Sequence, residues 1–227
     1  VSVALDCATA EAHVSWNASM GALYYIAYAW SSTFNFMSCE SSGPLTHCTL
    51  RDLICGDNYT VQVIAVGDEC SSLPSQAENF RTVPCAPEVT ATHLDCYTDS
   101  VLLQWSPTDG SISYTANART PEGLVSTCSS NSTNCELREL ACGQTYNVTL
   151  VSYDGRCHSM PGTALAVASV PCPPENVESN VLCSSNSAHV QWNPGAGAES
   201  YEVHAINTGG QMTGCDSTNT SCVMPNL

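Results

Sequence analysis

Short runs of alternating apolar and polar residues dominate the chain. Segments 59–65 (YTVQVIA) and 146–152 (YNVTLVS) have apolar side chains at alternate positions, as strands with one buried face do. Segments 12–16, 101–105 and 188–192 are also short and largely alternating, and turn residues such as those of 107–110 (PTDG) separate the runs. No stretch of about 12 residues has a helical period. The pattern predicts an all-β fold.

The pattern also repeats along the chain with a long period. Trp16, Trp105 and Trp192 are each followed nine residues later by a tyrosine. Most cysteines recur after 87 residues, namely Cys48, Cys55, Cys70, Cys85, Cys96, Cys128 and Cys135, which return as Cys135, Cys142, Cys157, Cys172, Cys183, Cys215 and Cys222. Cys7 and Cys39 recur after 89 residues, because a longer loop with Gly43 and Pro44 follows Cys39. A period this long is one small domain rather than a solenoid unit.

The period divides the 227 residues into three units. We expect a repeat in 1–84 that lacks its first residues, a complete repeat in 85–171, and a partial repeat in 172–227 that lacks its last strands. Half a sandwich would expose an apolar face and open strand edges. The third unit therefore predicts that the parent chain continues, or that a neighbouring molecule supplies strands by β-addition.

Charge and hydropathy exclude two classes of partner. The chain has 21 acidic residues, five scattered arginines and no lysine, for a net charge of −16. Nucleic acids and anionic membrane surfaces both require clustered cations, so we expect no nucleic acid partner and no direct membrane binding. No apolar run approaches the ~20 residues of a membrane span.

Fifteen cysteines indicate an oxidising compartment. Zinc sites bring cysteines together in close C-x-x-C-like pairs, whereas the closest cysteines here have six residues between them. Disulfides therefore explain the cysteines better than metal does. Five N-x-S/T sequons agree with a secreted or cell-surface glycoprotein, and the glycosylation candidates are Asn17, Asn58, Asn131, Asn147 and Asn219.

One constellation of residues resembles a known family. A tryptophan late in the second strand, a tyrosine nine residues later, and the motif L-x-x-G-x-x-Y at 53–59 and 140–146 resemble the fibronectin type III β-sandwich. The resemblance covers the whole chain and implies that Tyr59 and Tyr146 form tyrosine corners, with the hydroxyl bonded to nearby backbone. The residue before the motif's glycine is usually proline in the family but is Cys55 or Cys142 here. Repeated Cys-Gly in this slot is similar to a cysteine-rich member of the family.

The sandwich topology that the resemblance implies predicts the disulfide pairs. The first turn and the corner motif lie at the same pole, which implies Cys7–Cys55 and Cys96–Cys142. Cys157 precedes the last strand near the opposite pole, which implies Cys85–Cys157. Local pairs complete the scheme: Cys39–Cys48, Cys128–Cys135 and Cys215–Cys222.

One rival pairing and three leftover cysteines remain. The rival, Cys157–Cys172, is disfavoured because an extended last strand would separate those residues by ~25 Å, whereas a disulfide needs Cα atoms within ~7 Å. On this scheme Cys70, Cys172 and Cys183 take partners outside the chain.

No constellation of residues indicates catalysis. His13 and His189 alternate with valines and should face solvent, and His47 and His158 lie beside cysteines that we expect to be oxidised, which makes a metal site improbable there. Calcium at the junctions is a rival, but segments 83–88 and 170–175 hold one glutamate each, too few for that ion. We expect no catalytic residues, no cofactor and no metal. The proline-rich sequences of the junctions are typical of stiff spacers.

The pattern favours a structural or interaction protein over an enzyme. We expect an extracellular array that acts as spacer, scaffold or adhesive surface, as in extracellular matrix and cell adhesion, with protein partners or self-association through sandwich edges and loops. Polymerisation is compatible with this prediction. An alternative is the ectodomain of a cell-surface receptor, and a third is a set of accessory modules on an enzyme whose catalytic domain lies elsewhere.

Overall fold

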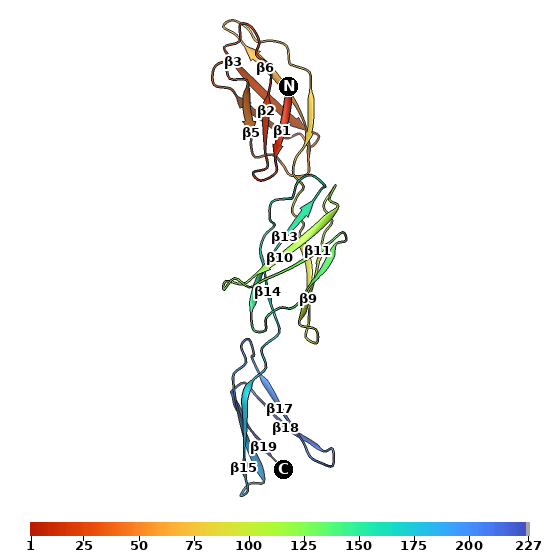
Figure 1. The fold of residues 1–227 in the computed structure, drawn as a ribbon, viewed down its shortest axis with the longest axis vertical. Coiled ribbons are helices and arrows are strands. Elements are labelled where there is room, and N and C mark those ends of the chain that lie inside the picture. Colours follow the sequence, from red (N-terminus) through yellow and green to blue (C-terminus); the bar gives the residue numbers. More distant parts are fainter. Residues whose placement is uncertain (226–227) are drawn as a thin grey trace.

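The computed structural model describes residues 1–225, and every regular element among them is an antiparallel β-strand. No helix in this part of the chain is long and apolar enough to cross a bilayer. The strands form three pairs of sheets that follow one another along the elongated molecule of Figure 1, each pair corresponding to one repeat. The all-β prediction is confirmed.

The first repeat packs a three-stranded sheet, β1-β2-β5, against a four-stranded sheet, β4-β3-β6-β7. Its strands are β1 (Ser2–Asp6), β2 (Glu11–Ser15), β3 (Tyr24–Ser31), β4 (Phe36–Glu40), β5 (His47–Leu50), β6 (Asn58–Val66) and β7 (Glu78–Arg81).

The second repeat has the same plan, with sheets β12-β9-β8 and β11-β10-β13-β14. Its strands are β8 (Val89–Asp95), β9 (Ser100–Trp105), β10 (Ser113–Arg119), β11 (Val125–Ser130), β12 (Asn134–Leu137), β13 (Thr145–Tyr153) and β14 (Leu165–Ala168).

The third repeat has sheets of three and two strands, β15-β16-β19 and β17-β18. Its strands are β15 (Glu175–Leu182), β16 (Ser187–Asn193), β17 (Tyr201–Ile206), β18 (Met212–Ser217) and β19 (Ser221–Pro225). The inner side chains Val203 and Ala205 are half-buried, whereas Ala116 and Ala118, their counterparts in the second repeat, are fully buried. The two-strand sheet therefore covers less of its own core.

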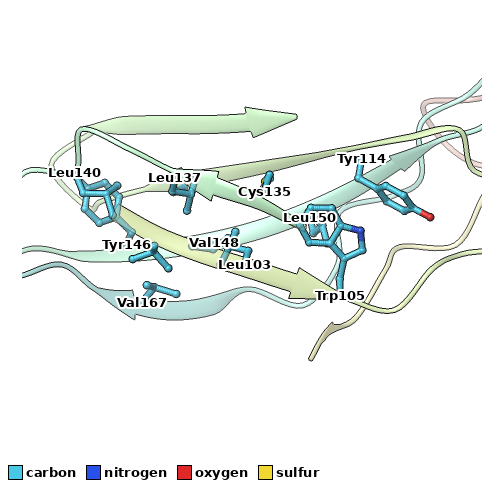
Figure 2. Packing of buried hydrophobic residues seen from close by; sticks show 13 residues of the cluster. Leu103, Trp105, Tyr114, Cys135, Leu137, Leu140, Tyr146, Val148, Leu150 and Val167 are labelled. Atoms are coloured by element: carbon cyan, nitrogen blue, oxygen red, sulfur yellow. The ribbon is translucent and has the colours of Figure 1, made fainter. Parts of the chain in front are cut away.

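The core of each sandwich lies between the inner faces of its two sheets. In β13 the inward positions Tyr146, Val148 and Leu150 are buried while their neighbours are more exposed, as strict alternation requires. They meet Leu103 and Leu137 from the opposing sheet, as Figure 2 shows. Burial of each large apolar side chain is worth about 1.5–3 kcal/mol, so this layer holds the two sheets together.

Two hydrogen-bonded tyrosines fix the ends of the core. The hydroxyl of Tyr59 accepts a hydrogen bond from the backbone N–H of Ile54 at 3.2 Å, and that of Tyr146 from Ala141 at 2.9 Å. Each phenol ring is buried while its oxygen bonds the turn just before the strand. These contacts are the tyrosine corners that the sequence motif predicts. They tie the corner at residues 53–57 or 140–144 to the strand that follows it.

Tyr146→Phe should lower the free energy of unfolding of the second repeat by about 1 kcal/mol, because the partly buried hydrogen bond from the N–H of Ala141 loses its acceptor. Urea denaturation followed by circular dichroism measures the change. Tyr153→Phe is the matched control, since the Tyr153 hydroxyl makes no hydrogen bond within residues 1–225. Equal effects of the two substitutions would contradict the assigned role of the corner.

Candidate functional site at the inter-repeat junctions

The junction between the first two repeats is built on a cysteine–glycine corner. Gly56 has a positive φ of 68°, a conformation that glycine adopts without strain, and its N–H donates to the carbonyl of Val83 at 2.7 Å. The Thr82 N–H donates to the carbonyl of Asp57 at 3.0 Å, and its hydroxyl accepts from the Asp57 N–H at 3.0 Å. The segment that leaves the first repeat is thereby held against that repeat's own corner.

A disulfide locks this arrangement. Cys55, in the corner, bonds Cys85, two residues beyond Val83, with Cα atoms 4.9 Å apart. The second junction repeats the plan: Cys142 bonds Cys172 with Cα atoms 4.8 Å apart, and the sequence separation is 30 residues in both cases. The cysteine that replaces proline in the corner motif therefore anchors the start of the next repeat.

The second junction repeats the hydrogen bonds as well. Gly143, with a φ of 64°, donates from its N–H to the carbonyl of Val170 at 2.7 Å. The loop before β17 packs tightly on this corner: a Cβ on Gly143 would lie 2.6 Å from the carbonyl oxygen of Ala196. Only a glycine fits there, so the third repeat is seated closely on the second.

A further disulfide joins the bodies of the first two repeats. Cys7, in the turn after β1, bonds Cys157, in the loop between β13 and β14, across 150 residues of sequence, with Cα atoms 5.3 Å apart. The Cys157 side chain is 1% exposed. The first junction thus has two covalent links, one through the linker and one through the loops on either side of it.

Polar contacts surround this second link. The Arg156 guanidinium donates to the carbonyl of Arg81 at 2.7 Å, and the Arg81 guanidinium donates to the carbonyl of Asp109 at 3.1 Å and to its carboxylate at 3.2 Å. Because the Asp109 side chain is 95% exposed, this ion pair contributes little to stability. A Cβ on Gly110 would lie 2.8 Å from the Arg81 guanidinium, so a glycine there leaves room for the arginine.

Asp154 holds the loop that carries Cys157. Its carboxylate accepts hydrogen bonds from the backbone N–H groups of Arg156 at 2.8 Å and Cys157 at 2.7 Å. Partial burial opposes ionisation of the carboxylate, but these hydrogen bonds outweigh it and hold the pKa of Asp154 below its ordinary value. The ionised side chain is therefore part of the structure that presents Cys157 to Cys7.

Each sandwich also contains one disulfide that bridges its two sheets. These disulfides join β4 to β5, β11 to β12 and β18 to β19, and each pair of strands comes from opposite sheets. These bonds are Cys39–Cys48, Cys128–Cys135 and Cys215–Cys222, with Cα atoms 5.9, 5.9 and 6.2 Å apart. All three are the local pairs expected from the sequence.

The three long-range pairings expected from the sandwich topology are wrong. Cys7–Cys55, Cys85–Cys157 and Cys96–Cys142 are replaced by bonds that cross the junctions. Cys7 and Cys55 both bond cysteines of the second repeat, because the short linker holds that repeat against the end of the first and supplies nearer partners. Cys172, expected to pair outside the chain, bonds Cys142. The constant 30-residue separation between corner and linker cysteines is the sequence signal that could have revealed this.

Cys70, Cys96 and Cys183 have no bonded partner among residues 1–225, and all three are exposed. Cys96 and Cys183 occupy the repeat position of Cys7, while Cys70 occupies that of Cys157. The unpaired thiols are thus equivalents of the two cysteines that cross the first junction.

The remaining candidate residues are on the surface. All five sequon asparagines are exposed, and those at Asn131 and Asn219 lie between the cysteines of the second and third sheet-bridging disulfides. His13 bonds the hydroxyl of Thr49 at 2.9 Å, and His158 packs on the ring of Tyr153 with centroids 4.6 Å apart. Within the described chain, no three His, Cys, Asp or Glu side chains gather closely enough to hold a metal ion.

Comparison with known proteins agrees with this architecture. Human fibronectin type III domain-containing protein 7 is 30% identical over 227 residues, which is all of this chain and 30% of that protein. This chain consists of fibronectin type III repeats. The mouse protein of the same name is 27% identical over 212 residues, 93% of this chain and 28% of its own length. The chain therefore spans less than a third of either relative.

More distant similarities connect the fibronectin type III repeats to other proteins. Chicken tenascin-R is 31% identical over 156 residues, 67% of this chain and 11% of that protein. A solved two-domain fibronectin type III segment from chicken tenascin has a TM-score of 0.40 at 23% identity, covering 74% of this chain and 96% of its own. No family model matches the chain.

Alkylation of the denatured, unreduced protein should label Cys70, Cys96 and Cys183 and leave the other twelve cysteines unlabelled. Peptide mapping without reduction should recover a Cys7–Cys157 crosslink between peptides of the first and second repeats. Recovery of a Cys7–Cys55 crosslink instead would show that Cys7 pairs within the first repeat, and would contradict the link between the repeats.

The Cys157 loop should lose stability in acid. Because the pKa of Asp154 is lowered in the folded state, its contribution is fully present above the ordinary carboxyl pKa and is lost as pH falls through the lower folded value. Asp154→Asn should therefore flatten the decline in melting temperature between roughly pH 5 and pH 2. Asp109→Asn, at a mainly exposed carboxylate, is the control and should leave that decline unchanged.

Proposed function

We propose that this chain is part of a non-enzymatic extracellular glycoprotein array that serves as a structural spacer, scaffold or adhesion surface. The observation that carries the proposal is the covalent path through the junctions. Two disulfides cross the first junction, and one crosses the second. Flexible tethering of domains requires no such links, whereas they would stiffen a load-bearing or distance-setting rod.

The disulfides also support the extracellular assignment. Six disulfides in a chain of 227 residues form and persist in an oxidising compartment but are rare in the cytosol. Five exposed sequons supply attachment points for the N-linked sugars of that compartment. Detection of the native protein in conditioned medium or on unpermeabilised cells tests this assignment, and confinement to the cytosol would refute it.

The repeated cysteine positions extend the proposal to neighbouring repeats. Cys96 presents to the third repeat the thiol that Cys7 presents to the second, and Cys70 corresponds to Cys157. In an array that keeps this register, each of these thiols would bond a cysteine of the adjacent repeat. Every junction would then carry the two links seen in the first, and protein partners would meet a continuous rod.

Removal of the loop-to-loop link should make the first junction flexible without unfolding either repeat. Small-angle X-ray scattering of Cys7→Ser/Cys157→Ser should show a smaller radius of gyration and a broader distance distribution, and proteases should cut residues 82–88 faster. In the chain-entropy model this closure of 150 residues is worth about 5 kcal/mol.

Cys39→Ser/Cys48→Ser is the matched control, because it removes a disulfide confined to the first repeat. It should lower the melting temperature of that repeat and leave the scattering dimensions unchanged. A double variant at Cys7 and Cys157 that scatters like the wild type would show that the junction needs no second link, and would count against the rod.

A further inference from the structure

The outer face of the four-stranded sheet in the first repeat carries an aromatic cluster, which consists of Tyr28, Trp30 and Phe36. Tyr28 stacks on Trp30 with ring centroids 5.6 Å apart and on Phe36 at 6.4 Å. The exposed fractions are 36% for Trp30 and 64% for Phe36. Contiguous apolar surface of this kind on a soluble domain indicates a contact that covers it.

The cluster is specific to the first repeat. The repeat period places Asn117, Arg119 and Val125 of the second repeat at the positions of Tyr28, Trp30 and Phe36. The third repeat has His204, Ile206 and Met212 at the same places. The aromatic rings are therefore not required by the sandwich fold, which forms in the second repeat without them.

A glycosylation sequon lies alongside this cluster. In the pairing of β3 with β6, Trp30 is directly opposite Thr60, which is the threonine of the sequon at Asn58. Asn58 is exposed on the same face of β6 as Thr60, because residues two apart in a strand share a face. Diagonal neighbours in such a pair lie about 7–8 Å apart, so Asn58 is a near neighbour of Trp30.

Asp57 ties the cluster to the sequon. Its carboxylate accepts a hydrogen bond from the Asn58 N–H at 2.8 Å and from the Ser32 hydroxyl at 3.3 Å, and it is also bonded by the hydroxyl of Thr33. Ser32 and Thr33 belong to the turn that connects the strands of Trp30 and Phe36. One buried carboxylate therefore fixes both the backbone at Asn58 and the turn beside it.

We propose that the first sugar of an N-linked glycan on Asn58 packs over this aromatic cluster. A pyranose ring has one face lined by C–H groups, which suits the negative face of an aromatic ring, while its hydroxyls stay in water. A sugar attached to Asn58 need not be recruited from solution, so little entropy opposes the contact. The aromatic cluster then contacts the chain's own glycan, and the sugar that covers it keeps this face of the sheet from pairing with other molecules.

The chemistry of attachment is the ordinary one for a secretory protein. The anomeric carbon of N-acetylglucosamine in a lipid diphosphate-linked oligosaccharide forms a bond to the Asn58 Nδ2. Its bond to the diphosphate breaks, the lipid diphosphate leaves, and the amide nitrogen loses one proton. This inference therefore rests on the proposed extracellular location.

The second repeat supplies a matched control. Asn147 is an exposed sequon asparagine on the corresponding strand, β13, but it lies opposite Arg119 rather than an aromatic ring. A glycan there has no aromatic surface to cover. Asn58 and Asn147 thus test the same modification on an aromatic and on a polar face of one molecule.

The test compares three forms of the chain secreted from mammalian cells: fully glycosylated, trimmed by endoglycosidase to one N-acetylglucosamine per site, and Asn58→Gln. Fluorescence of a hydrophobic dye such as anilinonaphthalene sulfonate should be low for the first two and severalfold higher for Asn58→Gln. Asn147→Gln should match the glycosylated protein. Trp30→Ser/Phe36→Ser should abolish the increase when combined with Asn58→Gln.

The outcomes separate the two proposals. Mass spectrometry that finds no sugar at any sequon would refute the extracellular glycoprotein itself. Sugar elsewhere but not on Asn58, or equal dye fluorescence with and without the Asn58 sugar, would overturn only the packing. Concentration-dependent dimerisation of the fully glycosylated protein, abolished by Trp30→Ser/Phe36→Ser, would overturn it in favour of a second copy of the chain as the occupant.

Discussion

The shortness of the linker is the constraint on which the rest of the molecule depends. Only three residues separate the end of β7 from Cys85, and backbone hydrogen bonds hold two of them, Thr82 and Val83, against the corner. A disulfide at Cys55 then prevents the linker from leaving that surface. Because the second repeat must begin there, its β13–β14 loop lies against the first turn of the preceding repeat, and the Cys7–Cys157 bond becomes geometrically possible.

The sequence predicted what depends on neighbours along one strand or one hairpin. Alternation in 146–152 gave the strand and its buried face, and the corner motif gave the hydrogen bonds of Tyr59 and Tyr146. The sandwich topology that the family resemblance implies also gave the sheet-bridging disulfides between neighbouring strands. The long-range pairs could not be derived in the same way, because topology within one domain does not say which residues of the next domain a pole meets.

The aromatic cluster shows a second limit of structure prediction from the pattern of apolar residues. Segment 24–30 (YYIAYAW) is apolar at every position, which is typical of a strand buried on both faces. In the structure only Tyr25, Ala27 and Ala29 face the core, while Trp30 remains exposed on the outer face. A continuous apolar run in the sequence thus does not distinguish a strand buried on both faces from one with a buried and an exposed face. Its polar counterpart at 113–119 shows that the outer face is free to vary without loss of the fold.

The edge strands of the repeats need protection against pairing with other molecules. A rod of sandwiches presents its edge strands, such as β7 and β14, along its length, where unpaired backbone groups invite pairing with other sheets. Lysine is the usual charge on such edges, and the chain has none. A net charge of −16 provides long-range repulsion between copies, but salt screens it beyond about 10 Å, so contact itself must be blocked by bulk. In the proposed array, N-linked glycans would supply that bulk, and the disulfides across the junctions would limit how far the repeats bend to expose an uncovered face.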